Sequence, residues 1–70
     1  MNYKKYNNFN EIKKHDEIKI TSTNEWNGCY GVVQDIDYIH KLAVIISIAK
    51  PVYVYYINEY NVHEIEKLEY

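Results

Sequence analysis

The fold is decided by the stretch Trp26-Asn27-Gly28-Cys29-Tyr30-Gly31-Val32-Val33-Gln34-Asp35-Ile36-Asp37-Tyr38. Its Asn-Gly pair suits a tight turn, because both residue types tolerate a positive φ. Gly31 opens the β-branched run that follows, where a glycine indicates a β-bulge or a close approach of two backbones. We therefore expect Gly28 and Gly31 to have structural roles at a turn, and residues 32–37 to form a strand.

Three further segments predict strands around this one. Residues 16–21 alternate polar and apolar side chains, as a half-buried strand does. Residues 42–48 are apolar nearly throughout, so we expect an N-terminal arm or a neighbour to cover their second face. Residues 52–57 alternate again after Pro51, which cannot donate to a ladder. The short connections make these strands an antiparallel meander.

The C-terminal segment allows two interpretations. Val62, Ile65 and Leu68 have helical spacing, and Asn61 with Glu64 resembles a capping box. The alternative is a short turn followed by a closing strand over residues 63–68. We favour the strand, because a four-stranded meander leaves exposed edges that a fifth strand would close.

Length and composition indicate one small domain. The chain has 70 residues, of which we expect residues 1–11 to form a polar, flexible arm and residues 12–70 to form the folded unit. Its single cysteine cannot form an internal disulfide and fits a reducing cytosol. No apolar run approaches the roughly 20 residues that span a bilayer. We therefore expect a cytoplasmic protein that does not bind membranes.

The charge balance weighs against nucleic acid as the main partner. The formal net charge is −2, and the basic residues are all lysines, so no guanidinium fork is available for phosphate or guanine. An RNA-binding role would require several lysines to gather beside aromatic side chains. The lysines considered for that role are Lys13, Lys14, Lys19, Lys41 and Lys50.

Nothing in the sequence has the pattern of a catalytic or metal site. His15, His40 and His63 are far apart and lack cysteines at ligand spacing. Cys29 has no nucleophile signature around it. No phosphate-binding loop or nucleophile elbow is present. We therefore expect a non-enzymatic protein without cofactor or metal.

Aromatic residues are the strongest indication of binding. They make up 16% of the chain, more than a small barrel can bury, and exposed Tyr and Trp are favoured contact residues. The predicted binding residues are Trp26, Tyr30, Tyr38, Tyr53, Tyr55 and Tyr60. For Trp26 the alternative is that it covers an open end of the barrel. For Tyr53 and Tyr55 the alternative is core or cross-strand packing.

Three segments of this sequence, in their order and spacing, resemble a KOW motif. The segments that carry the likeness are Asp16-Glu17-Ile18-Lys19-Ile20, the loop ending at Trp26, and Gly31-Val32-Val33-Gln34-Asp35-Ile36-Asp37-Tyr38. They are most similar to the C-terminal KOW domain of NusG/Spt5 transcription factors, and the likeness covers about residues 12–68. It implies a five-stranded, antiparallel, SH3-like barrel. Gly31 matches a glycine of the family, whereas His15 stands where the family usually has glycine.

The resemblance implies a binding function. NusG-type KOW domains are protein adaptors, and the ribosomal-protein type binds RNA but is basic. The leading hypothesis is a protein–protein adaptor or inhibitor that acts on transcription or translation machinery or another host complex. Asn, Ile and Tyr are abundant and favour A/T-rich codons, which indicates a low-GC genome and would suit a phage or mobile element. The alternatives are an RNA-binding KOW domain and a structural protein that self-associates through an exposed strand edge.

Overall fold

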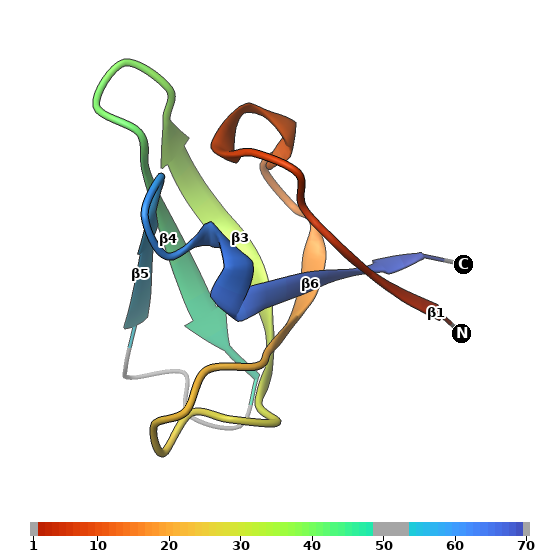
Figure 1. Cartoon of the computed structure of the whole chain (residues 1–70). Coiled ribbons are helices and arrows are strands. Elements are labelled where there is room, and N and C mark those ends of the chain that lie inside the picture. The colour runs from red at the N-terminus through yellow and green to blue at the C-terminus, as the bar shows by residue number, and fades with distance from the viewer. Residues whose placement is uncertain (1, 49–53, 70) are drawn as a thin grey trace.

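The computed structural model describes residues 2–48 and 54–69 as one antiparallel β-sheet with two short 3-10 helices (Figure 1). The elements are β1 (Asn2–Lys5), η1 (Phe9–Glu11), β2 (Glu17–Ile20), β3 (Tyr30–Asp37), β4 (Leu42–Ser47), β5 (Val54–Asn58), η2 (Val62–Glu64) and β6 (Ile65–Glu69). The strand order in the sheet is β1-β6-β2-β3-β4-β5. The sheet is open, with β1 and β5 at its two edges.

The expected all-β class and antiparallel meander are confirmed. β2, β3 and β4 lie in the segments expected to form strands, and β5 covers residues 54–57 of the fourth expected strand and continues to Asn58. Residues 52 and 53 lie outside the described part of the chain. The C-terminal segment is a strand, as favoured: a single 3-10 turn leads into β6, which pairs with β2.

The N-terminal segment differs from the expected flexible arm. Residues 2–5 form β1 and pair with β6, with Tyr3 opposite Leu68. Tyr6 and Phe9 then enter the core with only 8% and 3% of their surface exposed. The physical reason is the burial of these rings, because an aromatic side chain removes a large apolar area from water. Their burial outweighs the polarity of the asparagines between them.

The core is made mainly of isoleucines from one side of the sheet. Each of the largest fully buried aliphatic side chains exposes 1% of its surface or less: Ile12, Ile18, Ile20, Val33, Ile45, Ile57 and Ile65. They come from β2, β3, β4, β5 and β6 and from the segment before β2. Each such side chain contributes about 1.5–3 kcal/mol when fully buried. The period-2 alternation of the strands therefore sets which side faces the core.

Gly31 lies where β3 and β4 approach each other closely. It is opposite Ser47 on β4 and Ile18 on β2. A Cβ atom at this position would lie 2.8 Å from the carbonyl oxygen of Ile46 and 2.9 Å from Cγ2 of Ile45. Of the two roles expected for this glycine, close backbone approach is thus the one observed.

The β-bulge lies further along β3, at Gln34. Val33 is opposite Ile45, and the next paired residue, Asp35, is opposite Val44. The extra residue reverses the alternation of β3, because Val33 faces the core and Asp35 faces away from it. Asp35 and Asp37 consequently share the side of the sheet that is opposite the core.

Within residues 2–48 and 54–69, three residues have backbone conformations that favour glycine. Gly28 has φ +86, which agrees with the turn expected at the Asn-Gly pair. His15 has φ 78 and Lys41 has φ 53, in the left-handed region that side chains with a Cβ rarely adopt. The His15 backbone is held in place because its N–H donates to the Val33 carbonyl at 2.9 Å.

We predict that Gly31→Ala destabilises the protein by about 1–3 kcal/mol, because the new methyl group would overlap Ile46 and force β3 and β4 apart. Thermal and urea unfolding measure the loss. Gly28→Asn is the control: the site has open space around it and asparagine tolerates positive φ, so its cost is smaller. Equal stability of Gly31→Ala and the wild type would contradict the close approach.

At His15 we predict that a substitution raises the stability of the protein. His15→Gly removes the strain of a left-handed residue and stabilises the fold by about 0.5–1 kcal/mol. Lys14→Gly is the matched control; Lys14 is exposed and has no positive φ, so added chain entropy lowers stability there. A lower midpoint of urea unfolding for both variants would show that the conformation of His15 is not strained.

Candidate interaction face

The side of the sheet opposite the core carries an apolar surface, which we call the outer face. It comprises Tyr30, Val32, Leu42, Val44, Ile46, Val54 and Tyr56. The register places them together: Val32 is opposite Ile46, Ile46 is opposite Val54, and Val44 is opposite Tyr56. Residues directly opposite in a sheet point to the same side. Tyr56 exposes 56% of its surface and Leu42 exposes 40%.

The outer face extends past the end of β4. Ile48 follows the same alternation and is 68% exposed. Its N–H donates to the Tyr30 carbonyl at 2.9 Å, so the two residues are neighbours. Gly28, Cys29, Tyr30 and Ile48 line a shallow, mainly apolar hollow there. The outer face therefore runs from Leu42 at one end of β4 to this hollow at the other.

The outer face is exposed because the N-terminal segment does not lie over β4. We expected an arm or neighbour to cover the second side of residues 42–48. Instead, β1 pairs with β6, three strands away from β4 in the sheet order. Pairing satisfies the backbone groups of β1 and places its side chains beside β6. Within residues 2–48 and 54–69, an apolar sheet face is left accessible.

Charged side chains border the outer face on the β2 and β3 side. Glu17 is opposite Val32, Asp35 is opposite Val44, and Asp37 is opposite Leu42. Lys19, opposite Tyr30, is the positive charge in this row. The border is therefore more acidic than basic.

The Asp37 carboxylate is held in its charged form. It accepts a hydrogen bond from the His40 ring at 2.7 Å and others from the backbone N–H groups of Ile39 and His40. Together these bonds lower the pKa of Asp37 below its ordinary value, and the bond from the His40 ring has the largest effect. This end of the outer face consequently keeps its negative charge at neutral pH.

Lys19 lies against two tyrosine rings at the other end. Its Nζ is 5.3 Å from the centroid of Tyr3 and 5.9 Å from that of Tyr30, and the two rings are 6.2 Å apart. The geometry is that of a cation–π contact. It orders Tyr30 beside the outer face.

The predicted binding residues are not brought together on one face. Trp26 packs on Tyr55 with 5.6 Å between ring centroids, and both pack against the core. The Tyr55 hydroxyl donates to the Glu64 carboxylate and accepts from Asn24. Burial, followed by the bond to Glu64, raises the pKa of Tyr55. These two residues follow the alternative interpretation, in which they cover the core.

The other predicted aromatic residues are spread over the molecule. The Tyr38 hydroxyl donates to the Ile12 carbonyl at 2.5 Å, and its ring meets Phe9 edge-on. Tyr60 is 80% exposed in the turn after β5. Tyr53 lies outside the described residues. Of the five predicted residues that the structure describes, Tyr30 is the one that belongs to the outer face.

The six predicted binding residues did not include Tyr56, and sequence reasoning missed the apolar side chains of β4 as surface residues. A signal for them was present, because Tyr56 shares the alternation of Val54, and residues 42–48 are apolar on both sides. A strand that is apolar on both sides predicts either a cover within the chain or a partner outside it. The sequence alone did not decide between the two.

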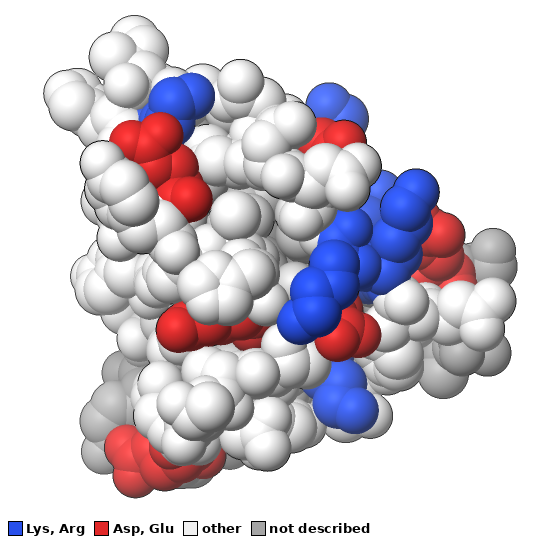
Figure 2. All heavy atoms as spheres, viewed as in Figure 1, with Lys and Arg blue, Asp and Glu red and all other residues white. Residues whose placement is uncertain are grey.

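The lysines considered for RNA do not form one patch in the described structure. Lys19 is on β2, Lys13 and Lys14 precede it, and Lys41 in the β3–β4 turn donates to Asn10. Lys50 lies outside the described residues. Figure 2 shows lysine side chains gathered in a band over β1, with acidic side chains on both sides of it.

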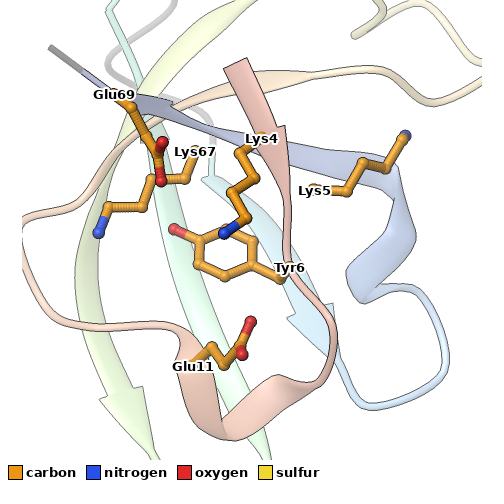
Figure 3. A pocket seen from close by; sticks show the side chains of 6 residues that line it. All are labelled: Lys4, Lys5, Tyr6, Glu11, Lys67 and Glu69. Atoms are coloured by element: carbon orange, nitrogen blue, oxygen red, sulfur yellow. The ribbon is translucent and has the colours of Figure 1, made fainter. Parts of the chain in front are cut away.

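A shallow pocket lies beside this band of lysines (Figure 3). It is lined by Lys4, Lys5, Tyr6, Glu11, Lys67 and Glu69. Three lysines and two glutamates line it, and Lys67 also lies 3.9 Å from the carboxylate of Asp16, which is not a lining residue.

The tyrosine of this pocket is held in its protonated form. The Tyr6 hydroxyl donates to Asp16 at 2.7 Å. Burial and then this bond raise the pKa of Tyr6 far above its ordinary value. The hydroxyl is therefore suited to positioning Asp16 rather than to proton transfer.

Two other kinds of site were sought. Across residues 2–48 and 54–69, no three His, Cys, Asp or Glu side chains lie close enough to hold a metal ion. Among the same residues, no helix is long and apolar enough to cross a membrane.

Both edges of the sheet are protected against pairing with another chain. β1 is four residues long and ends in Lys4 and Lys5, and short, lysine-bearing edges resist strand addition. On β5, the Asn61 side chain accepts from the Asn58 N–H at 2.6 Å and donates to the Tyr56 carbonyl at 3.2 Å. One amide thus takes two backbone groups that an added strand would need.

Comparison with known proteins identified no relative. No protein-family model matches the sequence, no curated protein is significantly similar to it, and no solved structure matches the fold.

We predict that Asn61→Ala increases self-association, because it frees the backbone groups of Tyr56 and Asn58 on the β5 edge. It should also lower stability by about 1 kcal/mol through the lost hydrogen bonds. Sedimentation velocity at increasing concentration measures the association. Glu59→Ala, an exposed change in the same turn, is expected to behave as wild type. If Asn61→Ala and wild type associate equally, Asn61 does not protect the edge.

Proposed function

We propose that this chain is a non-enzymatic protein-binding module with a KOW-related, SH3-like fold, and that its outer face is the contact surface. The observation that carries the proposal is the apolar outer face, whose exposed side chains include Tyr30, Tyr56 and Ile48. A small protein seldom leaves such a connected apolar surface open to water without a use for it. Contact with another protein removes it from water.

Several features of the chain support the SH3-like part of the proposal. The strands run in the order β6-β2-β3-β4-β5, so the last strand lies beside the first strand of the meander. The Tyr55–Glu64 hydrogen bond links β5 to the turn before β6. His15 has the positive φ that suits the glycine usual in KOW domains at this place. β1 is then a sixth strand added to the five-stranded arrangement.

The resemblance to NusG-type KOW domains suggests the setting of this function. An adaptor or inhibitor that acts on transcription or translation machinery would need a docking surface and no catalytic group. The outer face, bordered by Glu17, Asp35 and Asp37, suits a protein surface better than a phosphate backbone. The Lys19–Tyr3–Tyr30 contact favours RNA, because an aromatic ring beside a lysine can hold a base.

The test is affinity capture from a low-GC bacterial lysate, with and without nuclease. Three forms are compared: wild type, the double variant Val54→Ser/Tyr56→Ser on the outer face, and Tyr60→Ser as an exposed tyrosine elsewhere. We expect wild type and Tyr60→Ser to retain the same protein after nuclease treatment, and the double variant to lose it. Circular dichroism confirms that all three are folded.

Two outcomes would overturn the proposal. Capture that disappears with nuclease would assign the function to RNA binding. Capture that survives in the folded Val54→Ser/Tyr56→Ser variant would show that the partner binds elsewhere on the molecule.

A further inference from the structure

The partner of the outer face must satisfy its own backbone hydrogen bonds. The face consists of side chains, whereas the backbone groups of β3 and β4 are used within the sheet. An extended segment laid on it would bury open N–H and C=O groups against apolar atoms, at a cost of roughly 2–7 kcal/mol for each group without a partner. An α-helix pairs these groups internally. A helix therefore suits this surface, as would the face of a separate sheet, whereas a lone extended segment does not.

The two edges disfavour the usual alternative, in which a partner adds a strand. Asn61 bonds the Tyr56 carbonyl and the Asn58 N–H on β5. At the other edge, β1 ends in Lys4 and Lys5. Strand addition draws its affinity from main-chain hydrogen bonds along an edge, and on β5 the Asn61 side chain already takes two of those groups.

The dimensions of the face set the length of the helix. From Leu42 to Ile48 the alternate apolar side chains of β4 span about 20 Å, at the usual rise per strand residue. At 1.5 Å per residue, a helix of about 13 residues covers that distance. Val32 on one side and Val54 and Tyr56 on the other flank this line. A single apolar stripe on one helix matches this shape.

The charges on the border indicate which charge the partner should carry. Glu17, Asp35 and Asp37 lie along the β2 and β3 side of the outer face, against one lysine, Lys19. Basic residues beside the apolar stripe of the helix would complement them. A second copy of this chain, docked face to face, would offer the same mainly acidic border and so would not supply basic residues to complement Glu17, Asp35 and Asp37.

We propose, resting on the function above, that the outer face binds an amphipathic α-helix of a protein partner, with lysine or arginine beside its apolar stripe. The stripe lies along β4 between Leu42 and Ile48. The basic side chains lie over Asp35 and Asp37.

The test uses synthetic helical peptides of about 14 residues and the full chain labelled for NMR. The first peptide has a leucine stripe flanked by lysines, the second has the same stripe flanked by glutamates, and the third has the composition of the first in a scrambled order. We expect the first to bind about tenfold or more tightly than the others. Its chemical-shift changes should fall on β3, β4 and β5.

Variants of this chain locate the contact. Tyr56→Ser should weaken binding of the leucine–lysine peptide about tenfold, and Asp35→Asn should weaken it a few-fold and reduce its salt dependence. Tyr60→Ser is the control and should leave the affinity unchanged. Equal binding of the scrambled peptide, or shifts confined to β1 and β6, would overturn the proposal.

The outcomes separate this proposal from the proposed function. If the leucine–lysine peptide does not bind but lysate capture still depends on Val54 and Tyr56, the face is correct and the helix is wrong. If sedimentation shows a wild-type dimer that Val54→Ser/Tyr56→Ser dissociates, a second copy occupies the face and the helix proposal fails. If capture is also independent of the outer face, both proposals fail.

Discussion

Strand β2 is the connection on which the rest of the structure depends. It is only four residues long, yet it pairs with β3 on one side and with β6 on the other. Its Ile18 and Ile20 are almost completely buried. Without β2, the meander β3-β4-β5 and the pair β1-β6 would be two small sheets with open edges, each too small to be stable alone. The alternation of two isoleucines with two charged residues therefore joins the chain into one sheet with one core.

The strand order also determines where apolar side chains remain exposed on the sheet. Because β6 takes the free edge of β2, β1 must pair beyond β6 and cannot cover β4. The bulge at Gln34 then directs Asp35 and Asp37 to the same side as Val44 and Leu42. An apolar surface with an acidic border results from backbone pairing, without a dedicated binding loop. Asn61 closes the β5 edge, so an incoming protein meets side chains and not open backbone.

The predicted contact residues show where reasoning from residue type is weak. Trp26 and Tyr55 were chosen as exposed aromatics, but they pack on each other against the core. Tyr56, one position later, is the exposed residue. A shift of one position exchanges the two sides of a strand. The choice between Tyr55 and Tyr56 therefore depended on the register of β5 against β4, which local sequence does not contain.

The sequence by itself determined the all-β class, the strands β2, β3 and β4, most of β5, and the structural role of Gly31, whereas the structure decided that this role is a close approach and not a bulge. The strands follow from the local pattern of apolar and polar side chains. The role of Gly31 follows from the absence of a Cβ atom in glycine. Only the tertiary structure decided that residues 2–5 form a strand, that Trp26 packs inward and that the outer face stays open. Those features depend on which distant segments pair, such as β1 with β6. Such pairing is settled by the burial of Tyr6, Phe9 and the isoleucine core together, a property of the whole chain that no short segment carries.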